Sequence, residues 1–155
     1  MRKDTKKRLL RVISRAIVYD PNSKEILLVR NRGARYWYSP GGGWDHDKES
    51  IIKAAEREVL EEAGQKARVK QLLFVREFHE ADKISLEIYW LAEAPGGATK
   101  HNTGHQDLFG LVGETRWFTR NELKKITVFP EVLRKTFWER LKVAKKLPNP
   151  FLGVD

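Results

Sequence analysis

Hydrophobic and polar residues along this chain follow two different periods, which predicts a mixture of strands and helices. Short apolar runs that are rich in β-branched and aromatic residues, and that end at turn residues, predict strands. We expect these strands at residues 12–19, 25–30, 35–39, 68–78, 84–91 and 115–118. Apolar residues at helical spacing predict helices at residues 48–64, near residue 119 and at residues 131–145.

The order of these elements predicts the fold class. Strands and helices are mixed without a regular βαβ alternation, so we expect an α/β protein in which helices pack on a mixed β-sheet. A length of 155 residues fits one domain. We therefore expect a single domain over residues 1–155, with residues 1–8 as a flexible basic tail. Pro95 to Gly113 shows no periodic pattern, and an irregular segment this long is usually functional or disordered.

The first predicted helix has an apolar stripe that should pack on the sheet. Its members recur at helical spacing and are Ile52, Ala55, Val59 and Ala63. Asp47 or Ser50 is placed to cap the start of this helix, and Gly64 is placed to end it. The stripe fixes which face of the helix is buried, so the opposite face is free for chemistry.

That opposite face carries three carboxylates. Glu58, Glu61 and Glu62 fall in a sector roughly 100° wide, and like charges at such spacing destabilise a helix slightly. Mg²⁺ prefers oxygen ligands, so a bound Mg²⁺ would explain why three carboxylates lie side by side. An acidic helix face is more often a solvated surface, but the glycine-rich loop at Pro40–Gly43 and the interleaved Arg57 favour a metal site here.

The stretch from Gly43 to Gln65 resembles the Nudix box, Gly-x5-Glu-x7-Arg-Glu-U-x-Glu-Glu-x-Gly-U, in which U is a bulky aliphatic residue. The matching positions are Gly43, Glu49, Arg57, Glu58, Val59, Glu61, Glu62 and Gly64. Gln65 departs from the pattern because the family has an aliphatic residue there. This is a packing position that follows the helix along the chain, so the departure concerns local packing more than catalysis. The preceding residues 37–42 also resemble the family's usual lead-in to the box.

The resemblance implies a Nudix-type α/β/α sandwich and a metal-dependent pyrophosphohydrolase. Nudix enzymes cleave the diphosphate linkage of a nucleoside diphosphate derivative by attack of water at phosphorus, with Mg²⁺ or Mn²⁺ as cofactor. Arg57 and Glu49 would hold the metal-binding carboxylates in place, and one of those carboxylates would act as the base. By resemblance, the metal ligands are Glu58, Glu61, Glu62 and a backbone carbonyl near Gly42 or Gly43.

Acids and histidines outside the box are further candidates. The family often uses an additional carboxylate as base or ligand, and Glu114 is our first candidate, with Asp107 and Glu80 as alternatives. Each of the three could also be an ordinary surface acid. His101 and His105 are candidates for substrate contact, although a lone histidine in a loop is usually just exposed to solvent.

Basic and aromatic residues next to the box are candidates for binding the substrate. The arginines that could hold phosphates, or that could simply be solvated, are Arg30, Arg32 and Arg35. Trp37 could stack on a nucleobase, as could Tyr36 or Tyr38. Strand alternation should turn at least one of these three rings toward the core.

The composition narrows the class of protein. A formal net charge of +9 favours polyanionic partners such as nucleotides, polyphosphates or RNA, although a solubilising surface explains it equally well. The absence of cysteine excludes disulfides, thiolate metal sites and a cysteine nucleophile. No apolar run approaches the roughly 20 residues that span a bilayer. We expect a cytoplasmic protein that does not bind membranes and is a monomer or a homodimer.

Three functions stay open at this point. The first is hydrolysis of a small nucleoside diphosphate-linked molecule. The second is hydrolysis of the 5′-end of RNA, which the positive charge motivates. The third is a non-catalytic module that binds RNA or a phosphorylated ligand, and the presence of all three box carboxylates argues against it.

Overall fold

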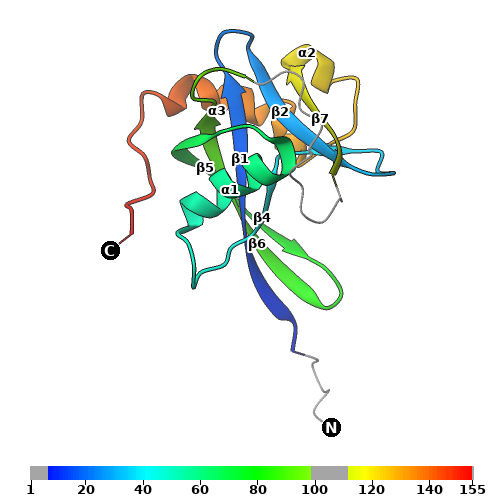
Figure 1. The fold of residues 1–155 in the computed structure, drawn as a ribbon, viewed down its shortest axis with the longest axis vertical. Helices are drawn as coiled ribbons and strands as arrows, with labels where there is room; N and C mark the ends of the chain where they lie inside the picture. The colour runs from blue at the N-terminus through cyan, green and yellow to red at the C-terminus, as the bar shows by residue number, and fades with distance from the viewer. Residues whose placement is uncertain (1–6, 99–111, 155) are drawn as a thin grey trace.

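The structure, a computed structural model, describes residues 7–98 and 112–154 of the chain (Figure 1). The strands are β1 (Leu9–Asp20), β2 (Glu25–Asn31), β3 (Trp37–Tyr38), β4 (Gly41–Gly43), β5 (Arg68–His79), β6 (Lys83–Glu93), β7 (Val112–Thr119) and β8 (Val128–Phe129). The helices are α1 (Ile51–Ala63), α2 (Arg120–Leu123), the 3₁₀ turn η1 (Glu131–Leu133) and α3 (Thr136–Ala144).

The strands form a mixed sheet in the order β5-β6-β1-β2-β3-β8, with β4 paired to β1 and β7 paired to β2. β1 runs parallel to β6, whereas it runs antiparallel to β4 and β2. β1 pairs with β4 through residues 13–15 but with β2 through Tyr19 and Asp20. The sheet therefore divides into two halves along β1, and the start of β1 extends with the β5–β6 hairpin beyond the helices (Figure 1).

Alternating side chains give the sheet two apolar faces. Along β1, Ile17 packs on one face, and Ala16 and Val18 pack on the other. The Ile17 face is covered by α2, η1 and α3, with Phe137 and Trp138 in its core. The other face is covered by α1, which lies on the opposite side of the strands from α3 (Figure 1). The predicted α/β/α sandwich is confirmed.

Helix α1 is held to the sheet at its first turn. Ser50 caps the helix by accepting a hydrogen bond from the backbone N–H of Lys53, and Gly64 ends it in the left-handed conformation at φ 57°. The buried hydroxyl of Ser14 donates to the carbonyl of Ile51 at 2.7 Å and accepts from Trp90 Nε1 at 2.9 Å. These contacts tie α1 to β1 and β6, so they fix where its acidic face points.

Two predicted elements differ from the structure. Gly41–Gly43 is a strand rather than a loop, and its φ values are not positive. Glycine is needed there for close approach, since a Cβ on Gly41 would lie 2.5 Å from the Ser14 carbonyl oxygen. The helix predicted over residues 131–145 is broken at Lys135, whose φ of −131° and ψ of −65° are not helical.

The polar residue at the end of the box has a structural place. Gln65 is 2% exposed, and its side-chain amide donates to the carbonyl of Lys66 at 2.8 Å and to that of Gly97 at 3.4 Å. It thus joins the end of α1 to the segment that follows β6, where an aliphatic residue could supply only packing. Of the helices in the described part of the chain, none is long and apolar enough to cross a membrane.

The apolar stripe of α1 predicts a stability effect. Val59 is fully buried, so Val59→Ala should lower the free energy of unfolding by about 1–3 kcal/mol by leaving a gap between α1 and the sheet. Urea unfolding measures this change. Leu60→Ala is the matched control, because Leu60 is 37% exposed and should cost less. An equal loss in both variants would contradict the assignment of the buried face.

Candidate active site

A pocket of about 780 Å³ opens beside the acidic face of α1, in the space between the two halves of the sheet. Its wall on one side is formed by three glycines of β4 and by carboxylates of α1, which are Glu58, Glu61 and Glu62. Its floor is formed by charged residues of β1, β5 and β6, which are Arg11, Arg15, Arg76, Lys83 and Glu87. Aromatic rings also line the pocket, namely Tyr36, Tyr38, Phe78 and Phe129, together with the buried Tyr89.

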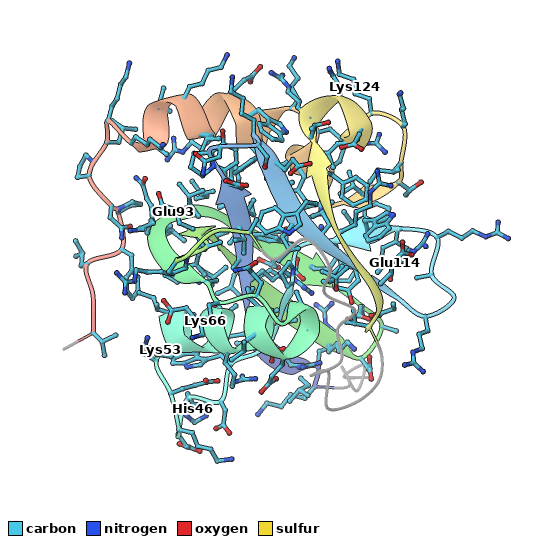
Figure 2. The ribbon with its side chains drawn as sticks, turned by 45° about the horizontal axis from the view of Figure 1, so that its top comes forward. His46, Lys53, Lys66, Glu93, Glu114 and Lys124 are labelled. Carbon is cyan, nitrogen blue, oxygen red and sulfur yellow. The ribbon has the colours of Figure 1, made fainter. Side chains whose placement is uncertain are left out.

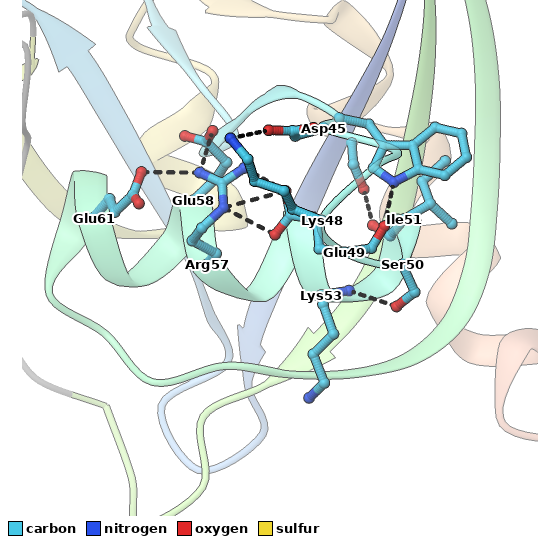
Figure 3. A network of polar contacts seen from close by, with 11 residues as sticks. Asp45, Lys48, Glu49, Ser50, Ile51, Lys53, Arg57, Glu58 and Glu61 are labelled. Carbon is cyan, nitrogen blue, oxygen red and sulfur yellow. Dashed lines mark hydrogen bonds and ion pairs between the residues drawn. The ribbon is translucent and has the colours of Figure 1, made fainter.

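The guanidinium of Arg57 joins three carboxylates (Figure 3). Its Nε and Nη2 donate to Glu49 at 2.9 and 2.7 Å, and its Nη1 donates to Glu58 at 2.9 Å and to Glu61 at 3.0 Å. The hydrogen bonds to Glu49, followed by those to Glu58, raise the pKa of Arg57 further above its usual value. The spacing of these residues along α1 and its preceding loop therefore produces one ionic cluster.

The glycines of β4 allow the carboxylates to approach the backbone closely. The N–H of Gly41 donates to Glu62 Oε2 at 3.1 Å. A Cβ on Gly42 would lie 2.5 Å from Glu58 Oε1, so any larger residue would displace the Glu58 carboxylate. Close approach, rather than backbone flexibility, explains why glycine stands at these positions.

The donor set is suited to a hard divalent cation. Glu58 and Glu61 each accept a hydrogen bond from Arg57 through one oxygen. No hydrogen bond from a described residue reaches the other oxygen, Glu58 Oε2 or Glu61 Oε1. Mg²⁺ commonly uses one or two carboxylates together with water and substrate phosphates. Within residues 7–98 and 112–154, no three acidic or histidine side chains already converge as a metal cluster. The carboxylates instead face Arg57 and Gly41, so a metal ion bound there would require their side chains to turn.

The floor of the pocket contains a second ionic cluster, centred on Glu87. Glu87 is 5% exposed, and its two oxygens contact Arg15 Nε at 3.2 Å and Arg76 Nε at 3.1 Å. The hydroxyl of Tyr89 donates to Glu87 at 2.9 Å, and burial raises the pKa of that phenol. Sequence reasoning missed this cluster because it depends on the register of the β5–β6 hairpin and on the pairing of β6 with β1, which is distant along the chain.

The predicted substrate residues lie mostly outside the pocket. Arg30 forms an ion pair with Glu114 and stacks on Trp37 at 4.7 Å, and neither charged residue lines the pocket. Trp37 is 5% exposed and packs in the core against Phe118. Arg35 is exposed on the surface and also does not line the pocket. Strand alternation thus turns the two neighbours of Trp37, rather than Trp37 itself, toward the pocket.

The other candidates outside the box do not line the pocket or lie outside the described residues. Glu80 forms an ion pair with Lys83 at 3.2 Å in the turn between β5 and β6. His101, His105 and Asp107 lie outside the described residues. Figure 2 shows Glu114 on the other side of the molecule from His46, which lies in the loop before α1, but the neighbouring Thr115 hydroxyl donates to the carbonyl of Glu62 at 3.5 Å.

The burial of Glu58 predicts a pH effect on stability. Desolvation raises the pKa of Glu58 and outweighs the hydrogen bond from Arg57. Because its pKa is raised, Glu58 favours the folded state when it is protonated. This contribution to stability is fully present below the pKa of glutamate in the unfolded chain, about 4.3, and is lost as pH rises through the pKa in the folded protein. Metal-free Glu58→Gln should therefore be more stable than wild type at about pH 7, with a difference that shrinks toward about pH 4.

Melting temperatures in EDTA across this pH range measure the effect. Glu139→Gln, on the exposed side of α3, controls for the loss of an acid. A Glu58→Gln protein that is less stable than wild type at neutral pH would contradict the role of desolvation.

Comparison with known proteins agrees with this geometry. The NUDIX domain family matches residues 9–137. Human diphosphoinositol polyphosphate phosphohydrolase 3-alpha is 30% identical over 128 residues, which cover 81% of this chain and 73% of that protein. A NUDIX hydrolase from Nitrosomonas europaea has the same fold, with a TM-score of 0.71 and 21% identity over 96% of this chain and 98% of that chain.

A second solved structure, the MutT protein from Methanosarcina mazei Go1, also shares the fold. It gives a TM-score of 0.66 at 21% identity and covers 90% of this chain and 98% of that chain. The match to the family extends well beyond the box, from the first strand to the start of α3. With the box motif, the sandwich and the Arg57 cluster, it shows that this chain belongs to the Nudix hydrolase family.

Proposed function

We propose that this chain, a hydrolase of acid anhydrides, is a divalent-metal-dependent pyrophosphohydrolase that cleaves the diphosphate linkage of a nucleoside diphosphate derivative. The observation that carries this proposal is the Arg57-centred cluster of carboxylates, which opens into the pocket beside the glycines of β4. Nudix hydrolases generally use divalent metal ions. The available oxygens of Glu58 and Glu61 agree with that requirement.

Glu58, Glu61 and Glu62 would hold the metal, together with a backbone carbonyl of Gly42 or Gly43. A divalent ion there would neutralise charge on the phosphoryl oxygens and lower the pKa of a bound water. Arg57 and Glu49 act as positioning residues, because the guanidinium keeps two of these carboxylates side by side despite their mutual repulsion.

In the proposed reaction, the oxygen of water forms a bond to one phosphorus while the bond between that same phosphorus and the bridging oxygen breaks. The second phosphate leaves with the bridging oxygen, and the proton from water passes to a carboxylate of the box. Charge spreads over the phosphoryl oxygens in the transition state, so positioning and charge neutralisation supply most of the rate. We assign no step to Glu114, whose carboxylate faces Arg30.

The aromatic rim supports a nucleoside as part of the substrate. Tyr36 and Phe129 are 40% and 48% exposed, and their ring centroids lie 5.4 Å apart at the mouth of the pocket. Exposed aromatic rings on a pocket rim can stack on a nucleobase. The human relative named above is called a diphosphoinositol polyphosphate phosphohydrolase, so a small phosphorylated molecule ranks ahead of the 5′-end of RNA.

Loss of two box carboxylates should abolish metal binding and activity together. Glu58→Gln/Glu62→Gln should lose saturable Mn²⁺ binding in a titration, and its kcat should fall by at least about 10²–10³ because charge stabilisation is lost. The control Glu93→Gln/Glu139→Gln removes two acids that do not line the pocket. Unchanged Mn²⁺ binding in the box variant, or an equal loss in the control, would refute the proposed metal site.

A panel of nucleoside diphosphate derivatives, assayed beside 5′-triphosphorylated RNA with Mg²⁺ and with Mn²⁺, tests the substrate class. We expect turnover of a free nucleotide derivative to exceed that of the RNA. Faster turnover of the RNA than of every free nucleotide would reverse the ranking. If the wild-type protein hydrolysed none of these compounds with either metal, the proposed activity itself would be refuted.

A further inference from the structure

We propose that the floor of the pocket is an anion subsite, built by Arg11, Arg15 and Arg76, that takes a phosphate group of the substrate other than the diphosphate being cleaved. Its place in the reaction rests on the proposed function, but its ability to bind an anion does not. It lies in the same pocket as the box carboxylates, but it is carried by β1 and β5 rather than by α1.

Glu87 holds two of these arginines in fixed positions. It contacts both through Nε, which leaves the terminal nitrogens of the guanidinium groups for other partners. Arg15 donates from Nη1 to the carbonyl of Ser39 at 3.1 Å, and the terminal nitrogens of Arg76 have no hydrogen bond to a described residue. Terminal guanidinium nitrogens match the geometry of phosphate oxygens.

The charges in this part of the pocket are unbalanced. Two guanidinium groups share the single carboxylate of Glu87. Arg11 has no ion pair with any described acid, and it lies beside β4, where a Cβ on Gly43 would be 3.1 Å from its Nη2. Arg11 is exposed to solvent, but the side chains of Arg15 and Arg76 are 18% and 34% exposed, so their shared carboxylate leaves positive charge in a partly desolvated site. An additional anion from outside would complete the balance.

Strand register gives the subsite its rigidity. Arg11 and Arg15 lie on the same face of β1, and Arg76 of β5 is directly opposite Glu87 of β6. The β1–β6 and β5–β6 pairs run along most of the length of these strands. The arginines are therefore placed by paired strands rather than by loops, so little ordering of the backbone is required when an anion binds.

Binding of inorganic tripolyphosphate in EDTA tests the subsite without the metal. Calorimetry should show saturable binding to the wild-type protein. Arg11→Gln/Arg76→Gln should weaken it by about tenfold to 100-fold for each guanidinium, since a hydrogen bond to a charged group contributes about 1.5–3 kcal/mol. Arg68→Gln/Arg116→Gln is the matched control, because it also removes two positive charges but neither residue lines the pocket.

The outcomes separate the possible explanations. Loss of binding in the Arg11/Arg76 variant alone supports the subsite, whatever the enzyme hydrolyses. An equal loss in the control variant would mean general charge attraction, and absence of binding to wild type would mean that the cluster is structural. Either result overturns the proposal.

A second comparison distinguishes a substrate phosphate from nucleic acid. A single-stranded RNA with a 5′-hydroxyl end should bind more weakly than tripolyphosphate in the same buffer. If the RNA bound more tightly, and lost its affinity in the Arg11/Arg76 variant, the subsite would serve an RNA backbone and the proposal would be wrong. Metal-dependent hydrolysis is measured separately, so failure of the subsite and failure of the proposed reaction are distinguishable.

Discussion

The site depends on one guanidinium. Arg57 lies between Glu49, Glu58 and Glu61, and without its charge these carboxylates would repel one another beside the pocket that Glu58 and Glu61 line. The cluster is placed by α1, whose start is fixed by the Ser14 hydroxyl and whose apolar stripe is buried on the sheet. The packing of the core is therefore linked directly to the position of the chemically useful oxygens.

The pocket combines two opposite ways of holding charge. On α1, the single guanidinium of Arg57 forms ion pairs with several carboxylates. On the floor, the single carboxylate of Glu87 forms ion pairs with two arginines. The first arrangement suits a divalent ion, and the second suits an anionic group of the substrate. Because the box carboxylates and the arginines lie on different elements, substitutions in one cluster should leave the geometry of the other largely intact.

Much of the site was predictable from sequence because its residues are local. The box determines α1 and its cap at Ser50, and helical spacing brings Glu61 to Arg57, whereas Glu49 reaches Arg57 from the residue before the cap. Trp37 was assigned to the substrate, but strand alternation buries it, and no local pattern distinguishes its two faces. The cluster around Glu87 depends on the register of the β5–β6 hairpin and on the pairing of β6 with the distant β1, which neither composition nor periodicity reports. Long-range register is thus the information that the sequence pattern lacked.

The most direct test of the account is Arg57→Lys, measured as Mn²⁺ affinity and kcat at saturating metal. Lysine keeps the positive charge but has a single nitrogen, so it cannot join three carboxylates at once. We predict that metal affinity or kcat falls by about 10- to 100-fold, as is usual when a group that orients metal ligands is replaced. A variant with wild-type metal affinity and wild-type kcat would contradict the claim that the guanidinium geometry, rather than its charge, organises the site.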